Sequence, residues 1–111
     1  MVASTAIGHG LLGVFELDEK GRILYSNIDE SSSSMYGETA LGGADFFTQV
    51  TGFANAPDLR RRFDLFRLNG MPAQSFDFTC QYPDGSAKIR IFMVRFKDAD
   101  ACSFLIHLKQ P

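Results

Sequence analysis

Residues 73–109, AQSFDFTCQYPDGSAKIRIFMVRFKDADACSFLIHLK, decide the fold of this chain. Apolar and polar residues alternate along three runs, at 73–82, 87–96 and 102–109, and turn-forming residues separate the runs. This alternation predicts three neighbouring antiparallel strands, because successive side chains of a strand point to opposite faces. One face offers a set of apolar side chains to a core: Phe76, Phe78, Cys80, Tyr82, Ile89, Ile91, Met93, Phe104, Ile106 and Leu108.

The opposite face of these strands is also rich in apolar residues, whereas a solvated antiparallel face is mostly polar. Single surface hydrophobes are ordinary. Here neighbouring strands place them together, so we expect a contiguous patch that something covers. The two candidates are a second copy of the chain, which would form a homodimer, and a flanking signalling helix. The predicted interface comprises Leu12, Val14, Phe92, Val94, Phe96, Leu105 and His107.

Upstream of these strands, the sequence predicts a β-hairpin followed by helical segments. Strands at 11–17 and 22–26 flank a turn that ends in Gly21, a residue that tolerates positive φ. The serine-rich residues 27–36 are too polar for a core strand, so we expect short capped helical turns there. A longer helix is predicted at 57–70, with proline at its start and Asn-Gly at its end. These elements together predict an α+β fold.

The totals describe one ordinary globular domain. The chain has 111 residues, 45% of them hydrophobic and 22% charged, with a net charge of −2. We expect residues 11–110 to form the domain and residues 1–10 to form a linker. The sequence has no basic cluster and no apolar run of membrane-spanning length, so neither nucleic acid nor a membrane is an expected partner. It also has no secretory signal, and Cys80 and Cys102 match no metal or redox spacing, so we expect a cytoplasmic chain with two free thiols.

The order and spacing of these elements resemble those of PAS sensor domains, and in detail the photoactive yellow protein family, over residues 12–109. The resemblance rests on Ile23, Leu24 and Asn27, on Asp45, Phe46, Phe47 and Val50, on Pro57 and Gly70, and on Phe76, Asp77, Phe78 and Thr79. It implies a five-stranded antiparallel sheet with short helices packed on one face and a ligand-sized pocket between them. It also implies a bacterial signalling domain.

The same resemblance implies a set of pocket residues. Glu30 matches the family's buried glutamate, which hydrogen-bonds the chromophore and could sense a ligand or a proton; the alternative is an exposed acid that caps a helix. Ser26, Ser34 and Tyr36 stand where the family has tyrosine, threonine and arginine. Phe53 stands at the position of the chromophore cysteine. The expected pocket comprises Phe15, Ser26, Glu30, Ser34, Tyr36, Phe53, Cys80 and Tyr82.

These substitutions argue against the known cofactors of this fold. A thioester to p-coumaric acid needs a thiolate, and the phenyl ring of Phe53 offers no nucleophile, so we expect no covalent p-coumaric acid. Haem is disfavoured because it needs an axial histidine. The predicted helix at 57–70 has none, His9 lies in the N-terminal residues, and His107 lies on the outward face. The helical segment also lacks the cysteine that flavin photochemistry would need.

Two functional hypotheses stay open. In the first, a sensor domain binds a small ligand non-covalently near Glu30 and relays the change through the outer sheet face. In the second, side chains such as Phe15, Phe53 and Tyr82 fill the pocket, and the domain serves only in protein–protein interaction or dimerisation. No nucleophile elbow, paired histidine spacing or metal cluster occurs in the sequence, so an enzyme is the least favoured class.

Overall fold

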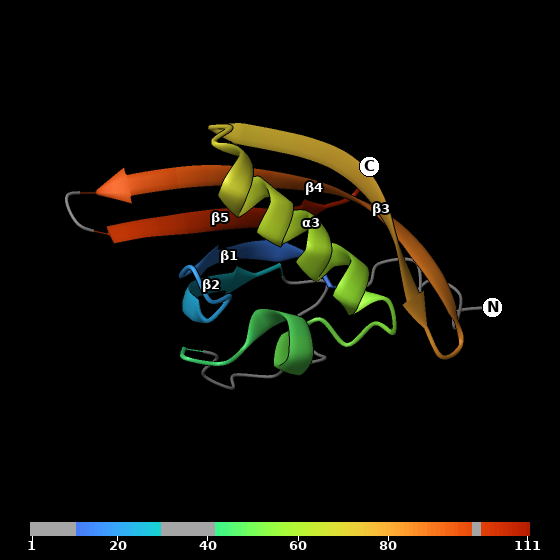
Figure 1. Ribbon diagram of the computed structural model, residues 1–111. Coiled ribbons are helices and arrows are strands. Elements are labelled where there is room, and N and C mark those ends of the chain that lie inside the picture. The colour runs from blue at the N-terminus through green and yellow to red at the C-terminus, as the bar shows by residue number, and fades with distance from the viewer. Residues whose placement is uncertain (1–10, 30–41, 99–100) are drawn as a thin grey trace.

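The structure is a computed structural model that describes residues 11–29, 42–98 and 101–111. A five-stranded antiparallel sheet forms one layer, and the two helical segments of the described chain lie against one of its faces (Figure 1). The elements in chain order are β1 Gly13–Leu17, β2 Ile23–Ile28, η1 Phe46–Val50, α3 Ala56–Asn69, β3 Ala73–Tyr82, β4 Gly85–Asp98 and β5 Ala101–Lys109. The predicted α+β architecture is confirmed.

The sheet brings the two ends of the described chain together. Its strands lie in the order β2-β1-β5-β4-β3, so the first and last strands are neighbours in the middle of the sheet. β1 pairs with β5, with Phe15 opposite Ile106 and Val14 opposite His107. β4 joins this centre to β3, and β2 and β3 form the two edges. The fold therefore depends on pairing between strands that are distant in sequence.

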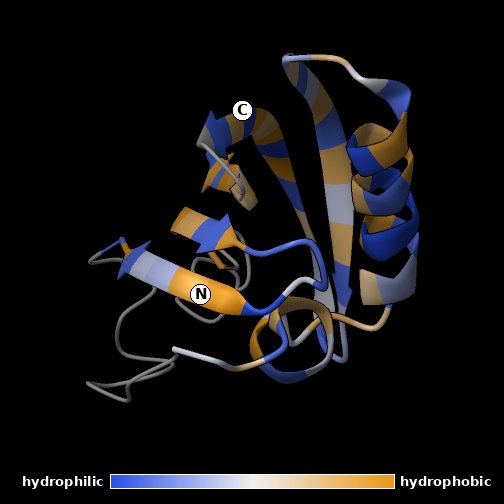
Figure 2. Cartoon of the chain, turned by 60° about the vertical axis from the view of Figure 1, so that its left-hand side comes forward, coloured by the Kyte–Doolittle hydropathy of each residue, from blue (hydrophilic) through white to orange (hydrophobic). Residues whose placement is uncertain are grey.

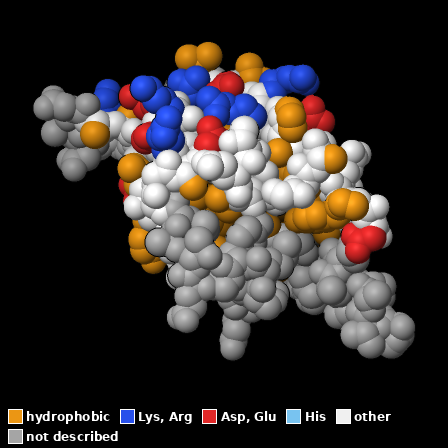
Figure 3. Space-filling view, turned by 90° about the horizontal axis from the view of Figure 1, so that it is seen from below, with side chains coloured by type: hydrophobic (Ala, Val, Ile, Leu, Met, Phe, Trp, Pro, Cys, Tyr) orange, Lys and Arg blue, Asp and Glu red, His pale blue; other side chains and the backbone are white. Residues whose placement is uncertain are grey.

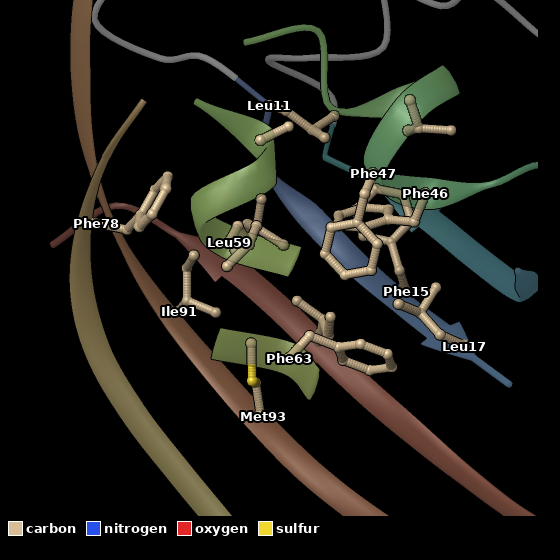
Figure 4. Packing of buried hydrophobic residues seen from close by; sticks show 14 of the residues in the cluster. Leu11, Phe15, Leu17, Phe46, Phe47, Leu59, Phe63, Phe78, Ile91 and Met93 are labelled. Carbon is tan, nitrogen blue, oxygen red and sulfur yellow. The ribbon is translucent and has the colours of Figure 1, made fainter. Parts of the chain in front are cut away.

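The core lies between the sheet and the helical segments and is dominated by phenylalanine. Phe15, Phe46, Phe47 and Phe63 point into the same space (Figure 4). The ring centroids of Phe15 and Phe46 are 4.8 Å apart, and those of Phe47 and Phe63 are 5.2 Å apart. Tilted contacts at these distances add to the hydrophobic burial. The inward-facing residues predicted for the last three strands are confirmed on this face; only Phe76 and Tyr82, both on the edge strand β3, are half-buried.

Several boundaries differ from the prediction: β1 begins at Gly13 rather than at residue 11, β4 extends to Asp98, and β5 begins at Ala101. β4 begins at Gly85, so residues 83–84 alone form the turn between β3 and β4. Asn27 and Ile28, which we expected to begin helical turns, extend β2 instead. Both pair with β1, and such pairing overrides the weak preference of polar residues for turns. From residue 30 onward, the predicted helical turns lie outside the described residues.

The short segment η1 is fixed by a capping residue at each end. Oδ1 of Asp45 accepts hydrogen bonds from the backbone N–H groups of Phe47 and Thr48, at 3.0 and 3.1 Å. At the other end, the hydroxyl of Thr51 donates to the carbonyl oxygen of Phe47 at 3.0 Å. This turn directs the rings of Phe46 and Phe47 into the core.

Arg95 of β4 joins the end of α3 to the sheet, a contact that the sequence pattern did not reveal. Its guanidinium donates to the carbonyl oxygens of Phe66 and Arg67, in the last turn of α3, and to that of Met71. The same group lies 5.0 Å from the ring centroid of Phe66 and 5.2 Å from that of Phe104. The last carbonyl groups of a helix have no partner within the helix. Arg95 therefore caps α3 and ties it to β4.

Candidate functional site

The three aromatic residues of the predicted pocket that the structure describes, Phe15, Phe53 and Tyr82, are packed against other side chains. The ring centroid of Phe53 lies 5.9 Å from that of Tyr82, at a nearly perpendicular angle. Phe15 is fully buried and packs on Phe46 of η1 rather than on Phe53, at a centroid distance of 4.8 Å. The structure thus brings Phe53 and Tyr82 together, and it surrounds Phe15 with core residues.

Tyr82 ties two distant parts of the sheet together. Its phenol oxygen accepts a hydrogen bond from the backbone N–H of Leu11, at 3.1 Å. Leu11 immediately precedes the β1 region, whereas Tyr82 ends the edge strand β3. The half-buried phenol therefore bonds to the chain itself.

Cys80 is fully buried on the inner face of β3. Burial raises the pKa of its thiol to about 12, and a hydrogen bond with Tyr82 acts in the opposite direction with a smaller effect. The side chain is therefore a neutral thiol near pH 7, and a neutral thiol is a poor nucleophile. Cys80 does not supply the reactive thiolate that is missing at Phe53.

The polar part of the predicted pocket is only partly described. Ser26 is half-buried and lies directly opposite Phe15 in the β1–β2 pair, so both side chains face the helical side of the sheet. Glu30, Ser34 and Tyr36 lie outside the described residues. Their assignment to the pocket, and the role of Glu30 as a buried acid, stay predictions.

The outer sheet face carries six neighbouring side chains that are only partly covered. Along one row His107 lies between Val14 and Phe92, and along the next row Val94 lies beside Leu105. The rings of Phe92 and His107 are 6.2 Å apart. We call this set the outer patch: Val14, Phe92, Val94, Phe96, Leu105 and His107.

Leu12 does not belong to the outer patch, so its predicted exposure is wrong. Its side chain is only 2% exposed and packs in the core cluster. The prediction extended the alternation of β1 back to Leu12, but β1 begins at Gly13. Gly13, the first residue of β1, has a φ of +152°, which is not that of a regular strand. Alternation counted back from Val14 therefore does not extend to Leu12.

A groove of about 650 Å³ runs between α3 and the edge strand β3. We call it the α3–β3 groove. Figure 2 shows α3 alongside the sheet, with bands of apolar and polar residues alternating along the helix. The groove is lined chiefly by Asp58, Arg61, Arg62 and Leu65 from the helix and by Gln74 and Asp77 from the strand. Alternation in the sequence shows which face is buried, but not how far a helix stands from a sheet edge, so no sequence pattern predicts this groove.

The charges of the groove are partly paired. Asp77 accepts a hydrogen bond from Nε of Arg90, at 2.9 Å, and this bond lowers the pKa of the Asp77 carboxyl and raises that of the Arg90 guanidinium. Oδ1 of Asp58 lies 4.0 Å from a terminal guanidinium nitrogen of Arg61. Arg62 lies over the ring of Phe76, with 4.3 Å between the guanidinium carbon and the ring centroid.

Comparison with solved structures identifies the fold. The photoactive yellow protein domain of the sensor histidine kinase Ppr from Rhodospirillum centenum matches with a TM-score of 0.61 and 23% identity, over 86% of this chain and 84% of that chain. The PAS domain of Bordetella pertussis BvgS matches with a TM-score of 0.61 and 16% identity, over 90% of this chain and 76% of that chain. A PAS domain of an HTR-like protein from Haloarcula marismortui matches with a TM-score of 0.58 and 14% identity, over 98% and 88% of the two chains.

The chain has the PAS fold, as its resemblance to PAS domains predicted. No family model and no curated protein matches its sequence. Within the part of the chain that the structure describes, no helix has the length and apolar character needed to cross a membrane.

Proposed function

We propose that this chain is a bacterial PAS signalling domain that transmits its signal through the outer patch, which pairs with a second copy of the chain. The observation that carries this proposal is the outer patch itself, where aromatic and aliphatic side chains from three neighbouring strands lie together and half-exposed. The most exposed of these residues, Phe96, has a 48% exposed surface. Contiguous apolar surface of this kind is typical of interaction sites.

Charge at the margins of the outer patch favours a second copy as its partner. Glu16 lies beside Leu105 at one end, and Nζ of Lys109 lies 5.5 Å from the ring centroid of Phe92 at the other end. Consider two copies packed face to face, related by a two-fold axis that lies in the interface and runs perpendicular to the strands. This axis places one end of the patch against the opposite end in the other copy, so Glu16 of one copy can lie against Lys109 of the other. Self-complementarity of this kind is what a two-fold interface requires.

Arg95 connects the helical layer to the strand that carries part of the outer patch, so a movement of the helix could be transmitted to the patch. It lies between Val94 and Phe96 in β4, and its side chain points to the opposite face, where it holds the end of α3. A shift of α3 would therefore act on the strand that supplies half of the outer patch. A signal of this kind needs only two arrangements of the helix that differ in their affinity for the partner.

The test is the oligomeric state of the purified protein. We expect a dimer by sedimentation at about 100 μM and a monomer for Phe92→Asp at the same concentration, because a buried unpaired carboxylate strongly opposes association. Leu68→Asp is the matched control, because Leu68 is 76% exposed on α3 and lies outside the outer patch. A monomeric unmutated chain would contradict the homodimer and leave the flanking helix as the partner of the patch.

A second candidate is a sensor that binds a small ligand non-covalently near Glu30. The half-buried polar groups of Ser26 and Tyr82 support it, because they border the inner face where the predicted pocket lies. The packing of Phe53 against Tyr82 favours the ligand-free alternative. Native mass spectrometry and an absorption spectrum of the purified protein separate the two. A bound small molecule adds mass beyond 12.3 kDa for each chain in the observed oligomer, whereas a whole multiple of the bare chain mass supports the interaction module.

We also propose that the domain carries no covalent chromophore or haem, is not an enzyme, and acts in the cytoplasm with its cysteines as free thiols. Phe53 and the neutral thiol of Cys80 support the first point. Protein incubated with activated p-coumaric acid should therefore gain no visible absorption band that survives denaturation. A stable band would contradict this expectation and would direct attention to Cys102 as the site of attachment.

A further inference from the structure

The edge strand β3 is only partly covered along its outer edge. The segment that leads into α3 pairs with its end: the N–H of Ala54 donates to the carbonyl oxygen of Gln81 at 2.7 Å. The side chain of Asn55 then bonds the same edge twice. Its Nδ2 donates to the carbonyl oxygen of Thr79 at 2.7 Å, and its Oδ1 accepts from the N–H of Gln81 at 3.0 Å. The chain itself therefore shows that this edge accepts an added segment.

Among the described residues, none pairs with the next part of this edge. Backbone groups of a strand point alternately to its two neighbours, so residues of the same parity as Thr79 and Gln81 direct their N–H and C=O groups away from β4. Ser75 and Asp77 have this parity, and their pairing with β4 has no bulge. No described residue makes a backbone bond to this side of either one. An extended chain can therefore add to the edge at these residues, in the way of strand addition.

The wall of the α3–β3 groove selects the chemistry of such a chain. Of the described carboxylates that line it, Asp77 is bound by Arg90 and Asp58 lies nearest to Arg61. Arg62 forms no ion pair with a described carboxylate, and Phe76 beneath it holds its guanidinium in place. Figure 3 shows Lys and Arg side chains gathered along the margin of the molecule on which α3 lies. The unmatched positive charge favours an acidic side chain.

An apolar contact is available in the same groove. Leu65 is 61% exposed although it is a leucine in the middle of α3, and it lines the groove one helical turn from Arg61 and Arg62. A strand laid along β3 alternates its side chains, so neighbouring residues can meet different surfaces. One set would face the helix with its arginines and Leu65, and the other would face away.

We propose that the α3–β3 groove binds an extended acidic peptide segment of a partner protein, which adds to β3 as a sixth strand at Ser75 and Asp77. Main-chain hydrogen bonds at these two residues would give affinity, and Arg62 with Leu65 would select an acidic side chain and an apolar one. This site lies outside the outer patch, so a domain dimerised through that patch could still bind the segment.

The test uses two labelled peptides and measures fluorescence anisotropy. The probe is fluorescein-labelled Thr-Val-Glu-Val-Leu-Val-amide, in which Glu and Leu lie on the same side of an extended chain, and the comparison peptide has Lys in place of Glu. We expect the acidic peptide to bind at least roughly ten-fold more tightly at low salt, since close charge pairs discriminate by this amount or more. We also expect the amide signals of Ser75 and Asp77 to shift in NMR spectra when this peptide is added.

Protein variants separate the two parts of the proposal. Ser75→Pro removes the edge N–H, and proline is tolerated there because that N–H faces away from the sheet; it should weaken binding by roughly ten-fold. Ser75→Ala keeps the N–H and is its matched control. Arg62→Glu should reverse the preference for the two peptides, whereas Lys20→Glu, in the exposed β1–β2 turn, should change neither affinity by more than about two-fold. Circular dichroism checks that each variant is folded.

Three outcomes would overturn the proposal. The first is no detectable binding of the acidic peptide at protein concentrations up to about 1 mM. A Kd above this value would be too weak for specific recognition. The second is equal binding of both peptides that is unaffected by Ser75→Pro. The third is a dimer that Ser75→Pro abolishes and Phe92→Asp does not, which would assign the free edge to a second copy of the chain.

Discussion

Arg95 makes several separate hydrogen-bonding and ring contacts with a single guanidinium group. It lies in an apolar alternating strand, and its charge alone would suggest a solvated position. Its guanidinium instead bonds three carbonyl groups and lies over Phe66 and Phe104. The planar fork of arginine suits this arrangement, whereas the ammonium group of lysine is a compact point charge.

Replacement of Arg95 by lysine should therefore destabilise the domain. We expect Arg95→Lys to lower the free energy of unfolding by about 1–3 kcal/mol, because carbonyl groups at the end of α3 lose charged donors. Urea unfolding followed by circular dichroism measures the change. Arg61→Lys is the control and should stay within about 0.5 kcal/mol, because Arg61 is exposed. Equal effects of the two substitutions would contradict the capping role of Arg95.

Cys80 predicts how stability depends on alkaline pH. The thiol ionises in the unfolded chain near its ordinary value of 9.0, but in the folded chain only near 12. Between these values the unfolded state binds fewer protons, so the free energy of unfolding should fall as pH rises, by up to about 1.4 kcal/mol per pH unit. Below pH 9 this contribution is fully present and constant.

The measurement compares variants rather than absolute slopes, because tyrosine and lysine also titrate in alkaline solution. Urea unfolding from about pH 8 to about pH 11 should show a shallower decline for Cys80→Ala than for the unmutated chain. Parallel curves for Cys80→Ala would show that the Cys80 thiol does not carry this pH dependence.

Among the elements, the hairpin of β1 and β2 depends on a close approach of two backbones. A Cβ atom on Gly13 would lie 2.7 Å from the carbonyl oxygen of Asn27 and 2.9 Å from Cα of Ile28. The φ of Gly13, +152°, is also one that side-chain-bearing residues rarely adopt. β1 lies between β2 and β5, so a displacement there reaches the middle of the sheet.

Gly13→Ala should accordingly cost about 1–3 kcal/mol of stability, as a residue forced into a sparsely populated conformation does. Gly42→Ala is the matched control, because a Cβ on Gly42 would have no heavy atom within 4 Å. Thermal unfolding of the two variants gives the comparison. A loss of melting temperature as large for Gly42→Ala as for Gly13→Ala would contradict the steric explanation.

In the molecule as a whole, both faces of the sheet carry apolar side chains, but those on one face are buried more completely than those on the other. Phe104 faces the helices and is almost fully buried, with its ring 5.3 Å from that of Phe63. Phe96, on the outer face, is about half-exposed. The described chain therefore has one core, and the outer patch is left for contacts beyond it.

This asymmetry predicts two different costs for the same substitution. Phe104→Ala should lower the free energy of unfolding by about 3–5 kcal/mol, because it opens a cavity in the core. Phe96→Ala should cost less than about 1 kcal/mol when measured at concentrations low enough to hold the chain as a monomer. Chemical unfolding of both variants checks the difference. Similar costs for both would show that the outer face is as tightly packed as the inner one.

Short-range patterns in the sequence by themselves determined the strands and their inner faces. β3 was predicted with its observed bounds, and Ile91, Met93 and Phe104 face the core as expected, because a strand's alternation has a fixed period of two. The end of α3 was likewise predicted from Asn69 and Gly70, and Gly70 adopts the left-handed conformation that ends a helix. The PAS fold followed from the order of these elements.

Only the tertiary structure decided the features that depend on contacts between distant segments. Leu12 is buried although alternation counted back from Val14 would turn it outward; Gly13, which lies between them, has a φ of +152° that a regular strand does not have. Alternation turns Arg95 to the inner face, but only the packing of α3 brings carbonyl groups within reach of its guanidinium, and no local pattern encodes that distance. The width of the α3–β3 groove and the open edge of β3 likewise depend on how a helix and a strand lie side by side in space. Local periodicity fixes which face a residue takes, whereas packing between segments fixes what that face meets.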